Sequence, residues 1–74
     1  MLDRKKALEF VSSILRKERV EEGEKVYDIN EPLSLLEANI IAVELRRATG
    51  VFMIAVGGTT TIGSIFDQVD EQLG

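Results

Sequence analysis

The residues of this chain that could take part in chemistry are few, and the commonest catalytic types are absent. The chain contains no histidine and no cysteine. This excludes Ser/His/Asp and Cys/His catalytic arrangements, disulfide bonds and thiolate metal sites. Three acidic residues near the C-terminus, Asp67, Asp70 and Glu71, lack the spacing of a calcium-binding loop; we expect Asp67 and Asp70 to be solvated. Without convergent carboxylates either, we expect a protein that is not an enzyme.

A glycine-rich run, Gly57-Gly58-Thr59-Thr60-Thr61, precedes a predicted helix and therefore has to be compared with phosphate-binding loops. It lacks the lysine and the spacing of such a loop. We interpret it as a loop followed by a helix cap, with Thr60 or Thr61 at the N-cap position.

Length and charge narrow the class of protein further. The 74 residues include nine Lys and Arg against thirteen Asp and Glu, a formal net charge of −4. This length predicts a single domain, residues 1–74, and the acidic balance argues against binding to nucleic acid. The longest apolar run, residues 51–56, is far shorter than the roughly 20 residues of a membrane helix. We expect a soluble, cytoplasmic monomer.

The element that must position any site is a central helix within residues 31–50, which begins near Pro32 and ends at Gly50. Proline is tolerated in a first turn, and glycine can adopt the left-handed conformation that closes a helix. One face at helical spacing is predicted to carry Leu36, Ile40, Val43 and Arg47, and further residues widen it: Leu33, Ile41, Leu45 and Ala48. Two neighbouring segments should cover this helix.

Two further helices are predicted on either side of the central one. The first spans residue 3 to about residue 19, with Asp3 as N-cap and an apolar stripe at Leu8, Val11 and Leu15, flanked by Ala7, Phe10 and Ile14. The last spans about residues 61–72, and its stripe consists of Ile62, Ile65, Phe66, Val69 and Leu73. The chain should therefore form a small all-α bundle of three to four helices.

The two connections are less regular. Residues 20–31 form a long polar segment that Val26 and Ile29 should anchor to the core. Residues 51–58, with the apolar run VFMIAV, fit a buried strand, a buried linker or a short helix. We expect Val51, Phe52 and Met53 in the core rather than in a pocket. A hairpin around Gly57-Gly58 would instead make the chain a small α+β interaction module.

The stretch PLSLLEANIIAVELR resembles the polyketide-type carrier motif P-L-S-x-L-G-x-D/N-S-L-x-A-V-E-L-R, and TTTIGSIFDQVDEQL is similar to the last helix of fatty-acid carriers. Together the two matches cover about two fifths of the chain. They indicate a resemblance to the acyl carrier protein family. The resemblance implies a helical bundle in which a serine at the start of the second helix carries a 4′-phosphopantetheine arm, whose thiol holds an acyl or aminoacyl group.

The attachment serine is missing or displaced in this chain. In one register the family serine falls on Asn39, which has no hydroxyl; in another, a serine expected between Asn39 and Ile40 is absent. The glycine of the motif is replaced by Glu37. In a third register Ser34, followed by Leu35-Leu36 as in peptidyl carriers, takes the serine's place, but Leu33 stands where Asp, His or Asn is usual.

The resemblance also implies the partners: a synthase, an acyltransferase or ligase, a phosphopantetheinyl transferase, and an acyl or aminoacyl cargo. Glu44, Arg46 and Arg47 would project outward where such enzymes recognise carriers. Glu44 and Arg47, three residues apart, could equally form an ordinary helical pair. The expected function is that of a carrier in fatty-acid, polyketide or peptide synthesis. The alternative within the same fold is a carrier-like domain without the arm that acts by protein interaction.

Overall fold

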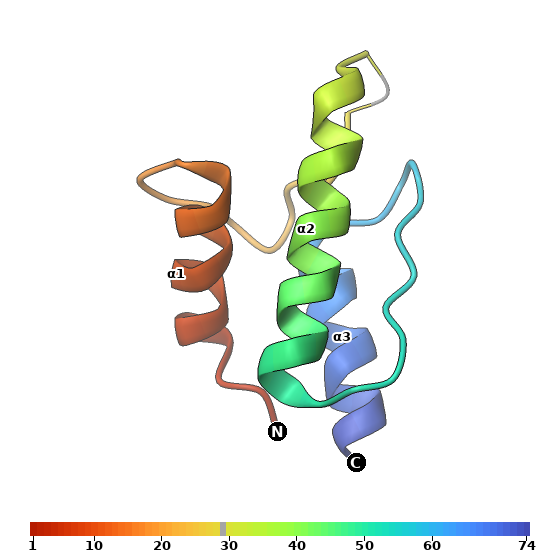
Figure 1. Ribbon diagram of the computed structural model, residues 1–74. Helices are drawn as coiled ribbons and strands as arrows, with labels where there is room; N and C mark the ends of the chain where they lie inside the picture. The colour runs from red at the N-terminus through yellow and green to blue at the C-terminus, as the bar shows by residue number, and fades with distance from the viewer. Residues whose placement is uncertain (29) are drawn as a thin grey trace.

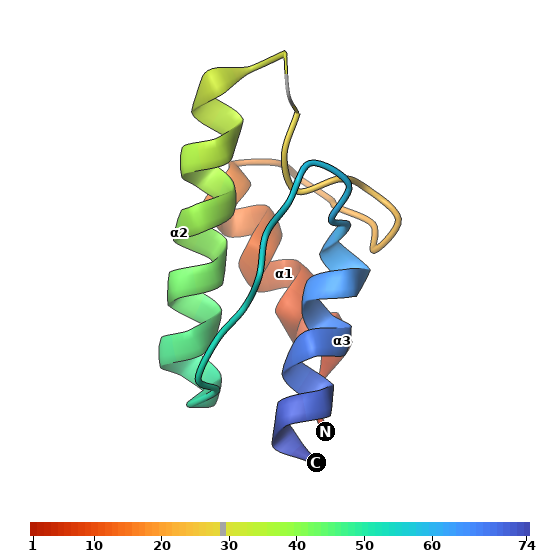
Figure 2. The same ribbon diagram turned by 90° about the vertical axis from the view of Figure 1, so that its right-hand side faces the viewer.

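The structure, a computed structural model, describes residues 1–28 and 30–74. In this part the chain forms three helices, α1 (Arg4–Leu15), α2 (Pro32–Thr49) and α3 (Ile62–Leu73). Figure 2 shows α1 and α3 on the same side of α2, which leaves the opposite side of α2 uncovered. The predicted all-α bundle is confirmed. The α+β alternative is wrong, because the second arm of its hairpin lies within α3.

The helix ends follow mostly from the local sequence. The Asp3 carboxylate caps α1 by accepting a hydrogen bond from Lys6 N at 3.3 Å, and Thr61 caps α3 by accepting one from Ser64 N at 3.1 Å. Gly50, at φ 77°, closes α2. The predicted end of α1 near residue 19 is wrong, since Arg16 takes the left-handed conformation at φ 57° and ends the helix at Leu15.

The buried face of α2 is not the face that the apolar pattern predicted. The residues of α2 that enter the core are Ala38, Ile41, Ala42 and Leu45. Ile41 and Leu45 were expected to lie beside the main stripe, whereas Leu36, Ile40 and Val43, expected at its centre, are exposed. Both faces are apolar, and the two small alanines let α2 approach its neighbours closely. The prediction therefore chose the wrong one of two possible faces.

The core is one cluster to which all three helices contribute. Its fully buried large side chains are Val11 on α1, Ile41 on α2, and Ile62, Ile65, Phe66 and Val69 on α3. Val20 and Val26 of the first connection are also buried, which confirms the anchoring role predicted for Val26. The second predicted anchor, Ile29, lies outside the described residues.

The first connection wraps around the beginning of α3. Ile62 N donates to Glu24 O at 2.9 Å, and Gly63 N donates to Glu22 O at 2.8 Å, so backbone carbonyls satisfy N–H groups that a helix N-terminus leaves unpaired. A Cβ at Gly63 would lie 3.2 Å from Glu22 O. Glycine at this position thus permits the close approach of the two backbones.

Residues 51–58 form an extended linker held against α3 by two glutamine side chains. Gln68 accepts from Ala55 N at 2.8 Å and donates to Ala55 O at 2.9 Å, and Gln72 bonds the backbone of Met53 in the same way. The side chains thus replace a partner strand. Val51 is buried as predicted, but Phe52 and Met53 are exposed, so the prediction that they belong to the core is wrong.

The chain termini are tied together through Arg4 and Asp70, and both ends of the chain lie at the same end of the bundle in Figures 1 and 2. Asp70 accepts from Leu2 N at 2.7 Å and from Arg4 Nη2 at 2.8 Å. Arg4 also pairs with Glu22 and Asp67, each at 2.6 Å. Asp67 is exposed as expected, but the expectation that Asp70 is simply solvated is wrong.

We expect Asp70 to make the fold sensitive to acid. Its pKa is lowered by the Leu2 N–H and by Arg4. A lowered pKa in the folded state means that the ionised carboxylate stabilises the fold above the unfolded pKa of about 4, and that this contribution disappears as the pH falls through the folded pKa. Urea midpoints from about pH 7 to about pH 3 should fall more for the wild type than for Asp70→Asn. Glu71→Gln, an exposed control on α3, should follow the wild type; equal slopes for wild type and Asp70→Asn would contradict this role.

Candidate functional site

The candidate site lies at the beginning of α2, where Ser34 occupies the first turn. Its hydroxyl accepts a hydrogen bond from Asp28 N at 2.9 Å and lies 2.6 Å from Glu31 O and 2.9 Å from Asp28 O. A hydroxyl has one hydrogen, so it can donate to only one of the two carbonyls at a time. Ser34 is half-buried, and its present role is to fasten the end of the first connection to α2.

A hollow of about 320 Å³ opens beside Ser34. Its remaining lining residues are Leu15, Lys17, Lys25, Val26, Asp28, Glu31 and Glu37. Three acidic and two basic residues therefore line the same hollow as Ser34. Lys17 Nζ lies 3.8 Å from Glu24 Oε1. The hollow offers both negatively and positively charged side chains to a small polar ligand. Its side chains include neither an imidazole nor a thiol.

Asn39 lies in a different environment from the one that the family motif implies. It is an exposed residue about two turns after Pro32, well inside α2. Its backbone N–H takes part in the helix, so the unpaired N–H groups of a helix N-terminus are not available there. Ser34 has the helix-start location of the family serine and Asn39 does not.

Glu44, Arg46 and Arg47 lie toward the other end of α2. Arg46 and Arg47 are exposed and Glu44 is half-buried, and Arg47 Nη1 donates to Glu44 Oε1 at 3.3 Å. The ordinary helical pair is thus present. Twelve residues separate Ser34 from Arg46, about 18 Å along the helix axis. The structure therefore does not bring these three residues together with Ser34.

A surface that the sequence did not assign to a site lies along the uncovered side of α2. We call Leu33, Leu36, Ile40 and Val43 the outer stripe; their exposed fractions are 74%, 59%, 43% and 45%. At about 100° per residue these four side chains point away from the face that holds Ile41 and Leu45. Contiguous exposed apolar surface of this kind commonly marks an interaction site. The sequence pattern contained these residues but predicted them as core.

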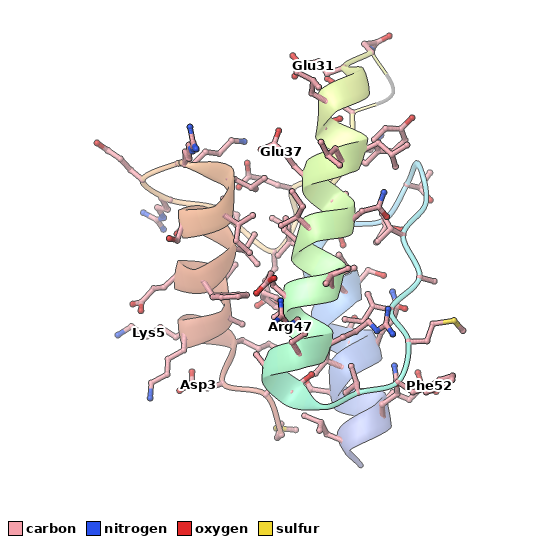
Figure 3. All side chains as sticks on the ribbon, viewed as in Figure 1. Asp3, Lys5, Glu31, Glu37, Arg47 and Phe52 are labelled. Atoms are coloured by element: carbon pink, nitrogen blue, oxygen red, sulfur yellow. The ribbon has the colours of Figure 1, made fainter. Side chains whose placement is uncertain are left out.

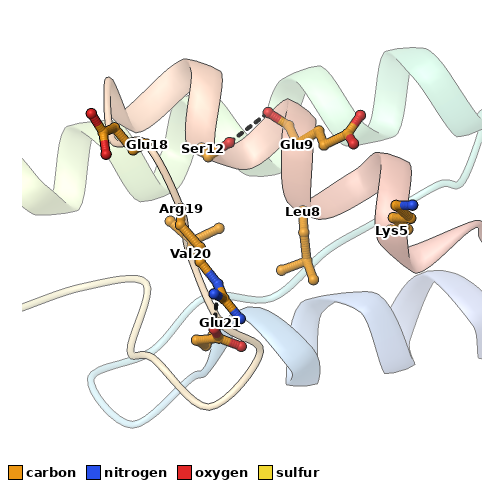
Figure 4. Close-up of a pocket in the computed structure, with 8 residues that line it drawn as sticks. All are labelled: Lys5, Leu8, Glu9, Ser12, Glu18, Arg19, Val20 and Glu21. Carbon is orange, nitrogen blue, oxygen red and sulfur yellow. Dashed lines mark hydrogen bonds and ion pairs between the residues drawn. The ribbon is translucent and has the colours of Figure 1, made fainter.

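A second hollow, also about 320 Å³, lies between α1 and the chain that follows it (Figure 4). Leu8 and Val20 form its apolar part. Its charged residues are Lys5, Glu9, Glu18, Arg19 and Glu21, of which Arg19 and Glu21 pair at 2.8 Å. The charges are mixed in sign and largely exposed, so this hollow indicates no particular ligand.

The inner faces of α2 and α3, where the resemblance to carriers implies that an acyl chain would lie, are occupied by core side chains. Ile41, Ile65 and Phe66 are at most 1% exposed. Cargo could enter there only by displacing them.

No protein family, curated protein or solved structure matches this chain. Within residues 1–28 and 30–74, no group of His, Cys, Asp and Glu side chains is arranged to hold a metal ion. None of the helices described has the length and apolar character that crossing a membrane requires.

Proposed function

We propose that the chain is a non-catalytic carrier protein of the acyl or peptidyl type. It would dock to enzymes of fatty-acid, polyketide or peptide synthesis in the cytoplasm and tether their intermediates as thioesters on 4′-phosphopantetheine. The order of its elements supports this proposal. The two segments that resemble carriers, residues 32–46 and 59–73, fall within α2 and on α3 with its cap.

The location of Ser34 is the observation on which the proposal rests. A phosphodiester is stabilised near a helix N-terminus, where unpaired N–H groups and the helix dipole favour negative charge. The N-cap residue Glu31 makes no side-chain cap bond. Pro32 has no N–H, and the N–H groups of Glu31 and Ser34 already donate to Asp28 O at 3.0 Å and Glu31 O at 2.9 Å, so the helix dipole is the main support for an anion here. Lys17 and Lys25 line the same hollow and could pair with a phosphate. The arm would therefore be attached to Ser34 Oγ and extend into solvent.

A second candidate, a carrier-like domain without the arm, is favoured by three observations. In one register of the carrier motif the family serine falls on Asn39, which has no hydroxyl. The Ser34 hydroxyl is already bonded to the backbone of Asp28, and Asp28, Glu31 and Glu37 around it would repel an anionic arm. In this version the chain acts by protein contact through the exposed side of α2.

Intact-protein mass after incubation with coenzyme A and a phosphopantetheinyl transferase separates the two candidates. We expect the mass to increase by one phosphopantetheine group, and Ser34→Ala to abolish the increase, because only Ser34 combines a hydroxyl with the first turn of α2. Ser12→Ala, a control at a half-buried serine of α1, should still be modified. The tryptic peptide from Val26 to Arg46 should carry the added mass. A folded wild type that stays unmodified would reject the arm and leave the second candidate.

A further inference from the structure

The residues of the outer stripe are spaced in a way that allows a second helix to pack on them. Leu33, Leu36, Ile40 and Val43 are separated by three, four and three residues, and Arg47 follows after four more. This is the alternating spacing by which two helices pack along a shared seam. The side chains of the stripe are exposed, and Figure 2 shows one side of α2 that neither α1 nor α3 covers, so a second helix could pack there.

We propose that a second copy of this chain packs on the outer stripe, with its α2 antiparallel to the first. The stripe is self-complementary in this orientation. When the two helices are related by a twofold axis that crosses the seam at the level of residue 38, Leu33 faces Val43 of the second copy and Leu36 faces Ile40 of the second copy. Each contact occurs twice, which gives four apolar layers and leaves no stripe residue unmatched. Such an isologous contact closes on itself.

The charges at the two ends of α2 favour this orientation. Glu31 is the N-cap residue of α2 and Asp28 lies three residues before it, whereas Arg46 and Arg47 lie in the last turn of the helix. Figure 3 shows Glu31 and Arg47 near opposite ends of the helix. Antiparallel packing brings the basic end of each copy to the acidic end of the other and aligns the helix dipoles favourably. Parallel packing would place arginines beside arginines.

The residues on either side of the helix–helix contact are less favourable for dimerisation, and they limit the affinity of the dimer. Glu37 lies on one flank close to the proposed axis, so the two copies of this carboxylate would face each other, whereas Asn39 lies on the other flank, where its amide can pair with its own copy. Four layers also make a smaller contact than a standard interface of about 1,600 Å². We therefore expect a reversible dimer with a dissociation constant on the order of 100 μM. The monomer favoured by the composition would be the form present at high dilution.

Sedimentation tests the contact directly. From about 10 μM to about 1 mM protein, a range that brackets the expected constant, the wild type should pass from monomer to dimer. Ile40→Glu should weaken dimerisation at least tenfold, because each dimer would contain two carboxylates inside the seam. Phe52→Glu makes the same charge change at a residue that is 85% exposed on the linker and should behave as the wild type. A wild type that stays monomeric throughout, which would leave the stripe to a different protein, overturns the proposal, as does equal weakening by both variants.

Disulfide cross-linking tests the relative orientation of the two α2 helices. The chain has no native cysteine, so only the introduced cysteines can form a disulfide. Leu33→Cys and Val43→Cys proteins, mixed and oxidised, should form a disulfide dimer, because these positions face each other in the antiparallel seam. Each variant alone should cross-link at least tenfold less. Efficient cross-linking of Leu33→Cys alone would indicate parallel helices and overturn the proposal. So would a mixture that sediments as a dimer without cross-linking.

Charge reversal tests the end contacts. Arg47→Glu and Glu31→Arg should each weaken the dimer several-fold, and the double variant should recover most of the lost affinity because residue 31 of each copy and residue 47 of the other again carry opposite charges. Lys6→Glu makes the same charge change as Arg47→Glu at an exposed residue of α1 and should have little effect. A double variant weaker than either single variant would contradict this pairing.

Discussion

Replacing Phe66 by alanine should lower the free energy of unfolding by about 3–5 kcal/mol. Phe66 is 0% exposed and is among the largest side chains of the core. Its removal loses the transfer free energy of the ring and leaves a cavity that packed neighbours fill only in part. A chain of 74 residues has a small core and little reserve of stability. The variant should therefore be mostly unfolded or melt far below the wild type.

Urea unfolding followed by circular dichroism measures this effect, with Phe52→Ala as the matched control. Phe52 is 85% exposed on the linker, so the same chemical change there should alter the free energy of unfolding by no more than about 0.5 kcal/mol. The Arg4 guanidinium lies 5.9 Å from the centre of the Phe66 ring and would lose this contact as well. If both variants lose the same stability, Phe66 is not the centre of the core.

The sequence predicts those parts of this fold that depend on local chemistry. Asp3 and Thr61 are capping residues by type, and both accept the expected hydrogen bonds. Gly50 closes α2 in the left-handed conformation. The end of α1 has no such marker, because Arg16 adopts the left-handed conformation without being glycine. Residue types thus predict that a helix forms, but they do not predict a helix end that is formed by an unusual residue such as Arg16.

Contacts between distant parts of the chain could not be predicted in the same way. Arg4 and Asp70 are 66 residues apart and meet only because α1 and α3 pack with their chain termini together. Gln68 and Gln72 read as ordinary polar helix residues, yet they hold the linker by its backbone. Such roles depend on tertiary arrangement, which no spacing within one helix records.

The position of the candidate site could be predicted from the sequence, but the hydrogen bonds of the Ser34 hydroxyl could not. The type of Ser34 and its place shortly after Pro32 locate it in the first turn of α2. That its hydroxyl bonds the backbone of Asp28 depends on the path of the first connection, which has no periodic pattern. The apolar character of the outer stripe follows from the sequence. Its exposure could not be predicted, because it results from α1 and α3 both packing on the other side of α2.

Two substitutions at adjacent positions distinguish the buried apolar face of α2 from the exposed one. Ile41 is 1% exposed and Ile40 is 43% exposed. Ile41→Ala should lower the free energy of unfolding by about 2–4 kcal/mol, because it removes buried methyl groups and leaves a cavity. Ile40→Ala should lower it by less than about 1 kcal/mol, since its side chain is already largely in water.

The comparison has to be made at low micromolar protein, where the proposed dimer is dissociated, so that only the fold of the single chain is measured. Urea midpoints of the two variants then report directly which face of α2 is inside. Because both substitutions remove the same atoms from adjacent positions of one helix, helix propensity changes equally in both and cancels in the difference. A larger loss for Ile40→Ala would mean that Leu36, Ile40 and Val43 form the core face after all, and that the outer stripe is not available to a second copy.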